Sequence, residues 1–221
     1  MEPLVFIIAY IFASHLVSEF AIRGIPKLEE TRWFLVHFLV NLLVTFCTAS
    51  HVAAFFVKPS LLYKDSTYAS KLPIAAVIGV HMYHVLWYDL RREDFFHHFV
   101  FLPTIGVPGY LYEWGGIGNL QLFFICGLPG MVLYYVLIMK RTRSNFDPNL
   151  EPALTAYLNV WVRMPGVLIA NFLLLYAFFN GFVNPPVWAF LCQVVLAPVN
   201  AIYYARQAWF RYENFRAYSN L

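Results

Sequence analysis

The sequence predicts an all-α fold, a polytopic membrane helical bundle with about seven transmembrane helices. Two observations lead to this prediction. Hydrophobic residues make up 61% of the 221 residues and charged residues only 12%, whereas a soluble domain carries roughly 25% charged residues. In addition, residues 33–57 and 164–205 contain no Lys, Arg, Asp or Glu. An uncharged apolar run of about 20 residues is long enough to cross a bilayer as a helix.

Turn signals separate seven apolar runs and so give the individual spans. Clusters of Asn, Pro, Gly and charged residues interrupt the apolar sequence, and such clusters favour turns. Prolines inside several runs predict bent helices. No internal repeat divides the chain, so residues 1–221 are expected to form a single membrane domain. The predicted spans lie at about residues 3–22, 33–57, 73–90, 95–113, 117–139, 153–178 and 186–207.

The basic residues predict the orientation of the bundle. Of the 15 Lys and Arg residues, 11 fall on one side of the predicted bundle, three fall on the other, and Arg163 lies within a span. Because cytosolic loops carry an excess of Lys and Arg, the C terminus is expected in the cytosol and the N terminus in the lumen or outside. The net charge of +3 therefore gives no reason to expect a nucleic-acid partner.

Polar residues inside the spans are candidates for function, because ionisable groups are costly in hydrocarbon. Helical spacing places four polar residues of the second span in one stripe, namely His37, Asn41, Thr48 and His51. In the third span it places His81, His84 and Tyr88 on one face. Such faces must turn toward the bundle interior or a wet cavity. The residues that we single out as ligand-binding are His51 in the second span, His84 and Tyr88 in the third, and Asn159 and Arg163 in the sixth.

These residues also have simpler interpretations. A transmembrane His often only bridges neighbouring helices, and this interpretation is favoured for His15, His37 and His81. Arg163 lies near the middle of its span and needs an anionic partner. Glu19 and Asp89 are candidate partners, and a bound phosphate or carboxylate is the alternative. A structural ion pair and a ligand site therefore both stay open for Arg163.

The stretch YHVLWYDLRREDFFHHFV, residues 83–100, holds the catalytic candidates. Asp89 ends the third span, and His97 and His98 begin the fourth. The short RRED turn predicts that these helices are antiparallel neighbours, which would bring Asp89 within reach of the His pair. Adjacent helical residues point in different directions, so only one of the two histidines is expected to face a cavity. A His with a carboxylate partner is the usual general-base arrangement.

Metal sites are disfavoured alternatives. A di-iron hydroxylase needs more histidines on one side than the seven that this chain distributes over several spans. A zinc site formed by His84, Asp89 and one of His97 and His98 is chemically allowed. The three cysteines lie far apart in the sequence, without a metal or redox spacing. We therefore expect neither a metal nor a resident cofactor.

Several segments resemble motifs of one membrane-protein family. TASHVAAFF contains His51, HMYHVLWYD ends at Asp89, and DFFHHF contains the His pair. CGLPG, NVWVRMPG with Arg163, and NAIYYARQAWF follow in the chain. In this order, over about residues 33–210, the sequence resembles the TLC-domain family, named for the translocating-chain-associating membrane protein, ceramide synthase and the ceroid-lipofuscinosis protein.

The resemblance implies a helical bundle around a lipid-accessible cavity in the endoplasmic reticulum or a related endomembrane. In ceramide synthases the paired His belongs to acyl transfer from acyl-CoA to a sphingoid amine, which would make His97 and His98 catalytic and acyl-CoA a co-substrate. That subfamily also has a His and acidic residues on the following helix, where this chain has only Asn119 and Gln121. The non-synthase members, linked to lipid composition, are therefore the closer likeness.

Three functions stay open on this basis. The first is a multi-pass protein that binds lipid or regulates membrane lipid composition. The second is an acyl-CoA-dependent lipid N-acyltransferase that uses His97 and His98, so enzymatic activity is uncertain. The third is a transporter or receptor for an anionic ligand centred on Arg163. Membrane lipids are the expected partners, and a homo-oligomer or a larger membrane-protein complex is compatible with each function.

Overall fold

The computed structural model of the protein describes residues 16, 19, 31–63, 68–90 and 92–219. Every regular element within these ranges is a helix, so the predicted all-α class is confirmed there. The first predicted span, at about residues 3–22, lies outside the described residues apart from residues 16 and 19.

Six rods of continuous helix make up most of the described chain, and three of them combine two α-helices with a π-helical turn. A short 3-10 helix, η1 (Pro59–Tyr63), follows the first rod. The rods are α3 (Arg32–Val57); α4 (Tyr68–Trp87); α5 (Arg92–Phe101), η2 (Leu102–Gly106) and α6 (Val107–Leu111); α7 (Gly115–Leu122), η3 (Phe123–Gly127) and α8 (Leu128–Thr142); α9 (Leu150–Leu158), η4 (Asn159–Arg163) and α10 (Met164–Phe179); and α11 (Val187–Ser219).

Four of these rods are long and apolar enough to cross a membrane. They span Arg32–Val57, Gly115–Thr142, Leu150–Phe179 and Val187–Tyr218, and they coincide with the second, fifth, sixth and seventh predicted spans. The protein is therefore treated as an integral membrane protein. The third and fourth predicted spans are also helical, as α4 and the rod from α5 to α6. The total of seven spans and the orientation of the termini stay predictions.

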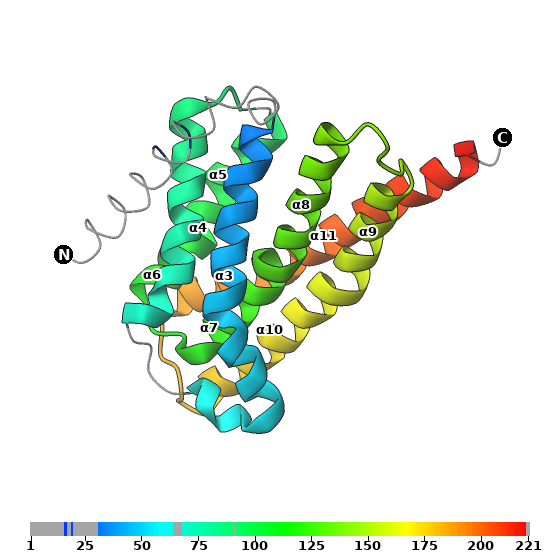
Figure 1. Cartoon of the computed structure of the whole chain (residues 1–221). Coiled ribbons are helices and arrows are strands. Elements are labelled where there is room, and N and C mark those ends of the chain that lie inside the picture. Colours follow the sequence, from blue (N-terminus) through cyan, green and yellow to red (C-terminus); the bar gives the residue numbers. More distant parts are fainter. Residues whose placement is uncertain (1–15, 17–18, 20–30, 64–67, 91, 220–221) are drawn as a thin grey trace.

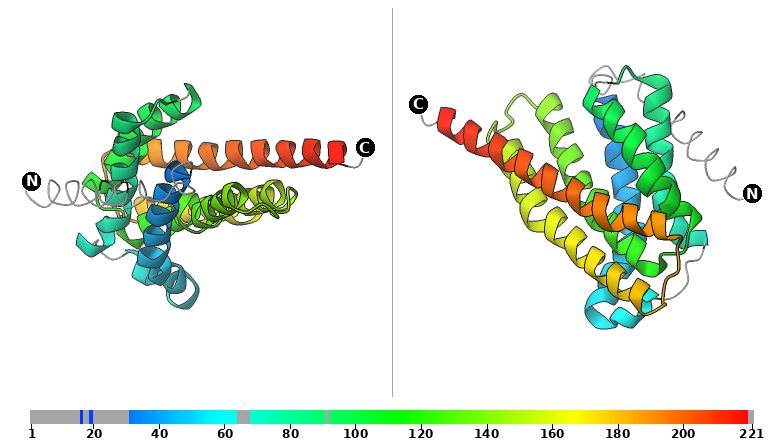
Figure 2. Two further views of the ribbon diagram at one scale, coloured as in Figure 1. Left: turned by 45° about the horizontal axis from the view of Figure 1, so that its top comes forward. Right: turned by 180° about the vertical axis from the view of Figure 1, so that it is seen from behind.

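The first rod is central in the bundle (Figure 1). α3 packs against α8 on one side and α4 on the other, while α11 packs against α9 and α10. Toward one end of the molecule α3 and α4 diverge from α9 and α11, whereas near the other end α7 packs against both α3 and α10. The right-hand view of Figure 2 shows α11 crossing the back of the bundle. The candidate site forms where α3, α4 and α5 meet.

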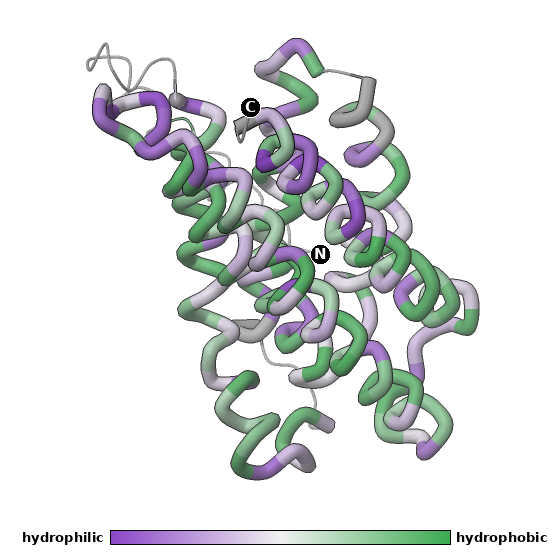
Figure 3. The backbone as a smooth tube through the Cα atoms, turned by 90° about the vertical axis from the view of Figure 1, so that its right-hand side faces the viewer, coloured by the Kyte–Doolittle hydropathy of each residue, from purple (hydrophilic) through white to green (hydrophobic). Residues whose placement is uncertain are grey.

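Large apolar side chains cover much of the outer surface. Phe46 is 73% exposed, Phe172 69% and Trp161 67%. Figure 3 shows apolar residues along the length of the rods, with hydrophilic residues concentrated toward the ends. Exposed apolar surface on this scale is costly in water and is expected where side chains contact lipid.

Three rods share one structural feature, a π-helical turn directly before an x-Pro-Gly sequence. The turns η2, η3 and η4 precede VPG, LPG and MPG, respectively. Proline has no N–H group and its ring clashes with the carbonyl of the preceding turn, and a π-helical turn accommodates one extra residue at that point. The bends that the prolines predict are therefore accompanied by π-helical turns.

The glycine after two of these prolines allows the rods to approach each other closely. A Cβ atom at Gly130 of α8 would lie 2.5 Å from Nδ2 of Asn41 on α3. A Cβ atom at Gly166 of α10 would overlap the ring of Phe124 in η3. These close contacts hold α8 against α3 and α10 against the fourth rod, as small residues do in membrane bundles.

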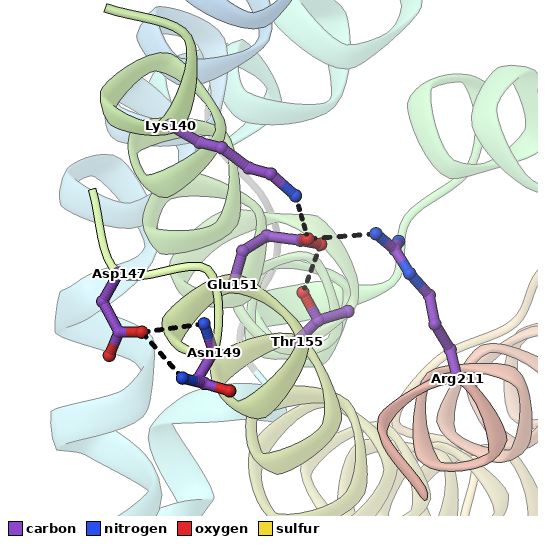
Figure 4. Close-up of polar contacts among 6 residues, drawn as sticks. All are labelled: Lys140, Asp147, Asn149, Glu151, Thr155 and Arg211. Carbon is purple, nitrogen blue, oxygen red and sulfur yellow. Dashed lines mark hydrogen bonds and ion pairs between the residues drawn. The ribbon is translucent and has the colours of Figure 1, made fainter. Parts of the chain in front are cut away.

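A buried carboxylate joins three rods at the diverging end of the bundle (Figure 4). Glu151 of α9 is 2% exposed. Its Oε2 atom accepts hydrogen bonds from Nζ of Lys140, at 2.9 Å, and from Nη2 of Arg211, at 3.0 Å. Thr155 donates to Oε1 at 3.4 Å. Glu151 therefore fixes the end of α8 and the polar part of α11 to α9.

Candidate functional site

Three helices bring five histidines together into what we name the histidine cluster. It contains His37 of α3, His81 and His84 of α4, and His97 and His98 of α5. The Nε2 atoms of His81 and His97 are 3.3 Å apart. Ring centroids are separated by 4.7 Å between His81 and His98, 5.8 Å between His84 and His98, and 4.3 Å between His37 and His84. The cluster is therefore continuous from α3 to α5.

Aromatic rings pack against the cluster from two sides. Trp33 stacks on His84 with a centroid distance of 3.8 Å, and Tyr134 of α8 stacks on His37 at 4.3 Å. His84 is fully buried and His98 is 5% exposed. The imidazoles thus occupy an aromatic environment that restricts their orientation.

Backbone carbonyls determine which nitrogen of two histidines carries a proton. Nδ1 of His81 lies 2.6 Å from the carbonyl oxygen of Val77, and Nδ1 of His37 lies 2.8 Å from that of Trp33. A carbonyl only accepts hydrogen bonds, so both Nδ1 atoms donate. In neutral His81 the Nε2 atom is then an acceptor, and the Nε2 atom of His97 donates to it. Neutral His97 consequently keeps its lone pair on Nδ1.

The structure corrects the expected contact between Asp89 and the His pair. α4 ends at Trp87, and Asp89 lies exposed in the segment that follows. Among the described residues, Asp89 makes no hydrogen bond or ion pair with His97 or His98. His97 instead contacts His81, through the Nε2 atoms of the two rings. The expected contact is absent because α4 ends before Asp89 and does not carry it on the face that meets α5.

Tyr88, one of the predicted ligand-binding residues, lies at the edge of the cluster, with its ring centroid 5.7 Å from that of His84. Its hydroxyl donates to Oε1 of Glu19 at 3.1 Å, and its ring lies edge-on to Trp33, with centroids 5.0 Å apart. Glu19 is 5% exposed, and its Oε1 atom is 3.5 Å from Nε of Arg32. The carboxylate of Glu19 is therefore engaged with Arg32 and Tyr88.

Arg163 and the histidine cluster share an aromatic neighbour, Tyr204. The guanidinium carbon of Arg163 is 5.9 Å from the ring centroid of Tyr204 on α11, and that ring is 6.4 Å from the ring of His97. Nη1 of Arg163 donates to Oδ1 of Asn159 at 2.7 Å, and Nδ2 of Asn159 donates to the carbonyl of Thr155 at 2.8 Å. Asn159 thus orients the guanidinium.

Neither predicted carboxylate pairs with Arg163. Within the described part of the chain, no Asp or Glu forms an ion pair with it, and its buried Nε atom makes no hydrogen bond. Glu19 binds Arg32, and Asp89 is exposed. The guanidinium is therefore a cation inside the bundle whose hydrogen-bonding capacity is only partly used.

His51 is not part of the histidine cluster. It lies fourteen residues after His37 on the same helix, which corresponds to about 21 Å along the axis. Its Nδ1 atom is 3.5 Å from the hydroxyl of Ser50, and its ring closely approaches Gly116 of α7. The other polar residues of its predicted stripe, Asn41 and Thr48, are buried.

Sequence reasoning singled out neither Trp33 nor Tyr134 nor Tyr204. Nothing in their spacing distinguishes them from the many other aromatic residues, which make up 19% of the chain. Their importance follows only from the packing of α3, α8 and α11 around the cluster. Among the described residues, no group of three or more His, Cys, Asp or Glu side chains is arranged to hold a metal ion.

No protein-family model, curated protein or solved structure matches the chain. The resemblance to the TLC-domain family accordingly rests on the sequence motifs.

Proposed function

We propose that the protein is a multi-pass, TLC-like membrane protein of the endoplasmic reticulum or a related endomembrane that binds a lipid and so regulates membrane lipid composition. The observation that carries this proposal is Arg163. Among the residues that the structure describes, no carboxylate pairs with Arg163. An unpaired intramembrane cation is costly, and a bound anion removes that cost.

The surroundings of Arg163 suit an anionic lipid head group. Guanidinium groups bind phosphate and carboxylate through paired hydrogen bonds, and Asn159 holds Nη1 in place while Nε remains available. The exposed apolar side chains on the outer surface of the rods suit contact with acyl chains. A head group at Arg163 would lie beside Tyr204, whose ring also neighbours His97 of the histidine cluster.

Native mass spectrometry of the detergent-purified protein with added phosphatidic acid or phosphatidylcholine tests the proposal. We expect the wild type to retain phosphatidic acid preferentially. Arg163→Gln should weaken this binding about 10- to 100-fold, because a charged hydrogen bond contributes about 1.5–3 kcal/mol. Arg206→Gln is the matched control, since Arg206 is exposed on α11. Equal losses in both variants, or none in Arg163→Gln, would refute the proposal.

A second function, acyl-CoA-dependent N-acylation of a lipid amine, is favoured by the His81–His97 contact. Nδ1 of His97 would take a proton as the amine attacks the thioester carbonyl. The C–N bond forms, the C–S bond breaks, and the departing thiolate receives the proton from the imidazolium. The ring of His98 contacts the rings of His81 and His84 and would hold these two histidines in position. Alternatively, one histidine of the pair carries the acyl group.

Incubation of the purified protein with labelled acyl-CoA and a sphingoid amine tests this second function. Labelled amide product, or a covalent acyl adduct, that disappears in His97→Ala and His98→Ala would support catalysis. Neither product nor adduct in the wild type would exclude the reaction for these substrates.

A further inference from the structure

A small cavity lies away from the histidine cluster, at the end of the bundle where α7 and α10 meet. Its volume is about 50 Å³. Five of the six rods contribute to its wall: α4, the α5–α6 rod, the fourth rod, α10 and α11. Most of the lining side chains are apolar, including Ile74, Ile105, Ile117, Leu122 and Leu174. It is separate from the site around Arg163.

Two buried amides line this cavity and have unused hydrogen-bonding atoms. Gln121 of α7 is 6% exposed, and Gln193 of α11 is 5% exposed. Nε2 of Gln193 donates to the carbonyl of Ile105, in the π-helical turn η2, at 3.3 Å. Among the described residues, Nε2 of Gln121 and Oε1 of Gln193 have no hydrogen-bond partner. The cavity therefore offers one free donor and one free acceptor, and buried polar atoms of this kind are rarely left unsatisfied.

The charged residue in the wall is already neutralised. Lys71 pairs with Glu113, with Nζ and Oε1 2.5 Å apart, and its ammonium group lies 5.9 Å from the ring centroid of Tyr110. The side chain of Glu113 is 49% exposed, so this ion pair marks the outer edge of the cavity. A site without net charge favours a neutral ligand over an anion.

We propose that the cavity binds the hydroxyl group of a neutral, hydroxyl-bearing lipid. One hydroxyl can accept a hydrogen bond from Gln121 and donate one to Gln193 at the same time. The adjoining methylene group fits the apolar wall, and the volume is sufficient for a hydroxymethyl group but too small for a charged head group such as phosphocholine. Water offers the same hydroxyl chemistry, and the experiment separates these two sources.

Oleyl alcohol and oleyl methyl ether are the matched probes, because the ether differs only in having a methyl group in place of the hydroxyl hydrogen. Native mass spectrometry of the full chain in detergent should show oleyl alcohol retained at least about tenfold more strongly than the ether. Gln193→Leu should abolish this preference, because Oε1 of Gln193 accepts a hydrogen bond from the alcohol and cannot accept one from the ether. Gln121→Leu removes the donor that either oxygen can use and should weaken the binding of both probes. Gly109→Ala should weaken alcohol binding without removing an amide, because the added methyl group would occupy part of the cavity that Gly109 lines. This methyl group would lie at an ordinary contact distance of 3.6 Å from Nε2 of Gln193.

Two control variants test whether a loss of alcohol binding comes from the cavity itself. Gln207→Leu changes an exposed amide of α11, and Arg163→Gln changes the separate lipid site, so both should leave alcohol binding unchanged. Equal binding of the alcohol and the ether, or alcohol binding that survives both Gln121→Leu and Gly109→Ala, would overturn the proposal. An absence of alcohol adducts in the wild type would show that the cavity takes up water alone and would overturn it as well.

Discussion

At the residue scale, the carbonyl of Val77 fixes the tautomer of His81, and His81 in turn fixes that of His97. Both steps follow from short contacts, of 2.6 Å and 3.3 Å. A histidine usually receives this orientation from a carboxylate or a backbone carbonyl. Here a second histidine transmits the orientation, and Asp89 takes no part in it.

Replacing His81 with Phe should therefore change His97. The ring would still fill the space, but the acceptor for Nε2 of His97 would be lost. We expect ¹⁵N NMR of histidine-labelled protein to show His97 with its proton on Nε2 in the wild type and a mixture of tautomers in His81→Phe. His37→Phe, elsewhere in the cluster, should leave the His97 signal in place. An unchanged His97 tautomer in His81→Phe would contradict the assignment.

A second residue-scale prediction concerns Gly166. Its replacement by Ala would force the ring of Phe124 to move, and overpacking of this kind typically costs about 1–3 kcal/mol. Thermal unfolding in detergent should show a clear loss of stability that Phe124→Leu partly restores. Gly109→Ala is the control, because its methyl group would meet neighbours at ordinary distances of 3.5–3.6 Å. Equal stability of the two alanine variants would show that the close contact at Gly166 is unimportant.

The sequence predicted the buried face of α3 but not the neighbours of His97. Helical spacing correctly placed Asn41 and Thr48 on a buried face of α3, because that face depends only on the periodicity of one helix. The neighbours of His97 depend on how α4 is rotated against α5 and on where α4 ends. Neither is encoded in the spacing of residues 83–100, so Asp89 was predicted in place of His81.

At the scale of elements, hydropathy predicted the apolar parts of the helices but not their polar continuations. α3, at Arg32–Val57, agrees with the predicted 33–57. α11 runs from Val187 to Ser219, well beyond the predicted end at about residue 207. Polar residues such as Arg and Glu are good helix formers, so a helix continues where its apolar pattern ends.

The polar end of α11 should depend on Glu151. Glu151→Gln keeps the size of the side chain but weakens the hydrogen bonds from Lys140 and Arg211. We expect faster hydrogen exchange in residues 205–219 and in the 143–149 connection. Charged hydrogen bonds contribute about 1.5–3 kcal/mol each when buried, and less where the partners are partly exposed, as they are here.

Glu213→Gln provides the control for that experiment. Glu213 lies on the same helix and accepts a hydrogen bond from Nε1 of Trp209 at 2.7 Å, but it is exposed. Exchange should remain close to that of the wild type. If Glu151→Gln exchanged no faster than Glu213→Gln, Glu151 would not be the link between α9 and α11.

At the scale of the whole molecule, the excess of Lys and Arg at one end of the rods predicts the side that faces the cytosol. Ser60 and Ser144 lie at opposite ends of the first and fourth rods, and both are exposed. In a variant with Cys47, Cys126 and Cys192 replaced by Ala, we expect a membrane-impermeant maleimide to label Ser144→Cys in sealed microsomes. Ser60→Cys should be labelled only after detergent is added. The reverse pattern would invert the orientation.

The whole-molecule account depends on an anion at Arg163, and a cryo-electron microscopy map of the protein in nanodiscs containing phosphatidic acid tests this most directly. We predict a lipid phosphate within hydrogen-bond distance of Nε of Arg163, beside Tyr204 and the histidine cluster. A carboxylate side chain of the protein in that position, or a guanidinium without any anionic neighbour, would contradict the account.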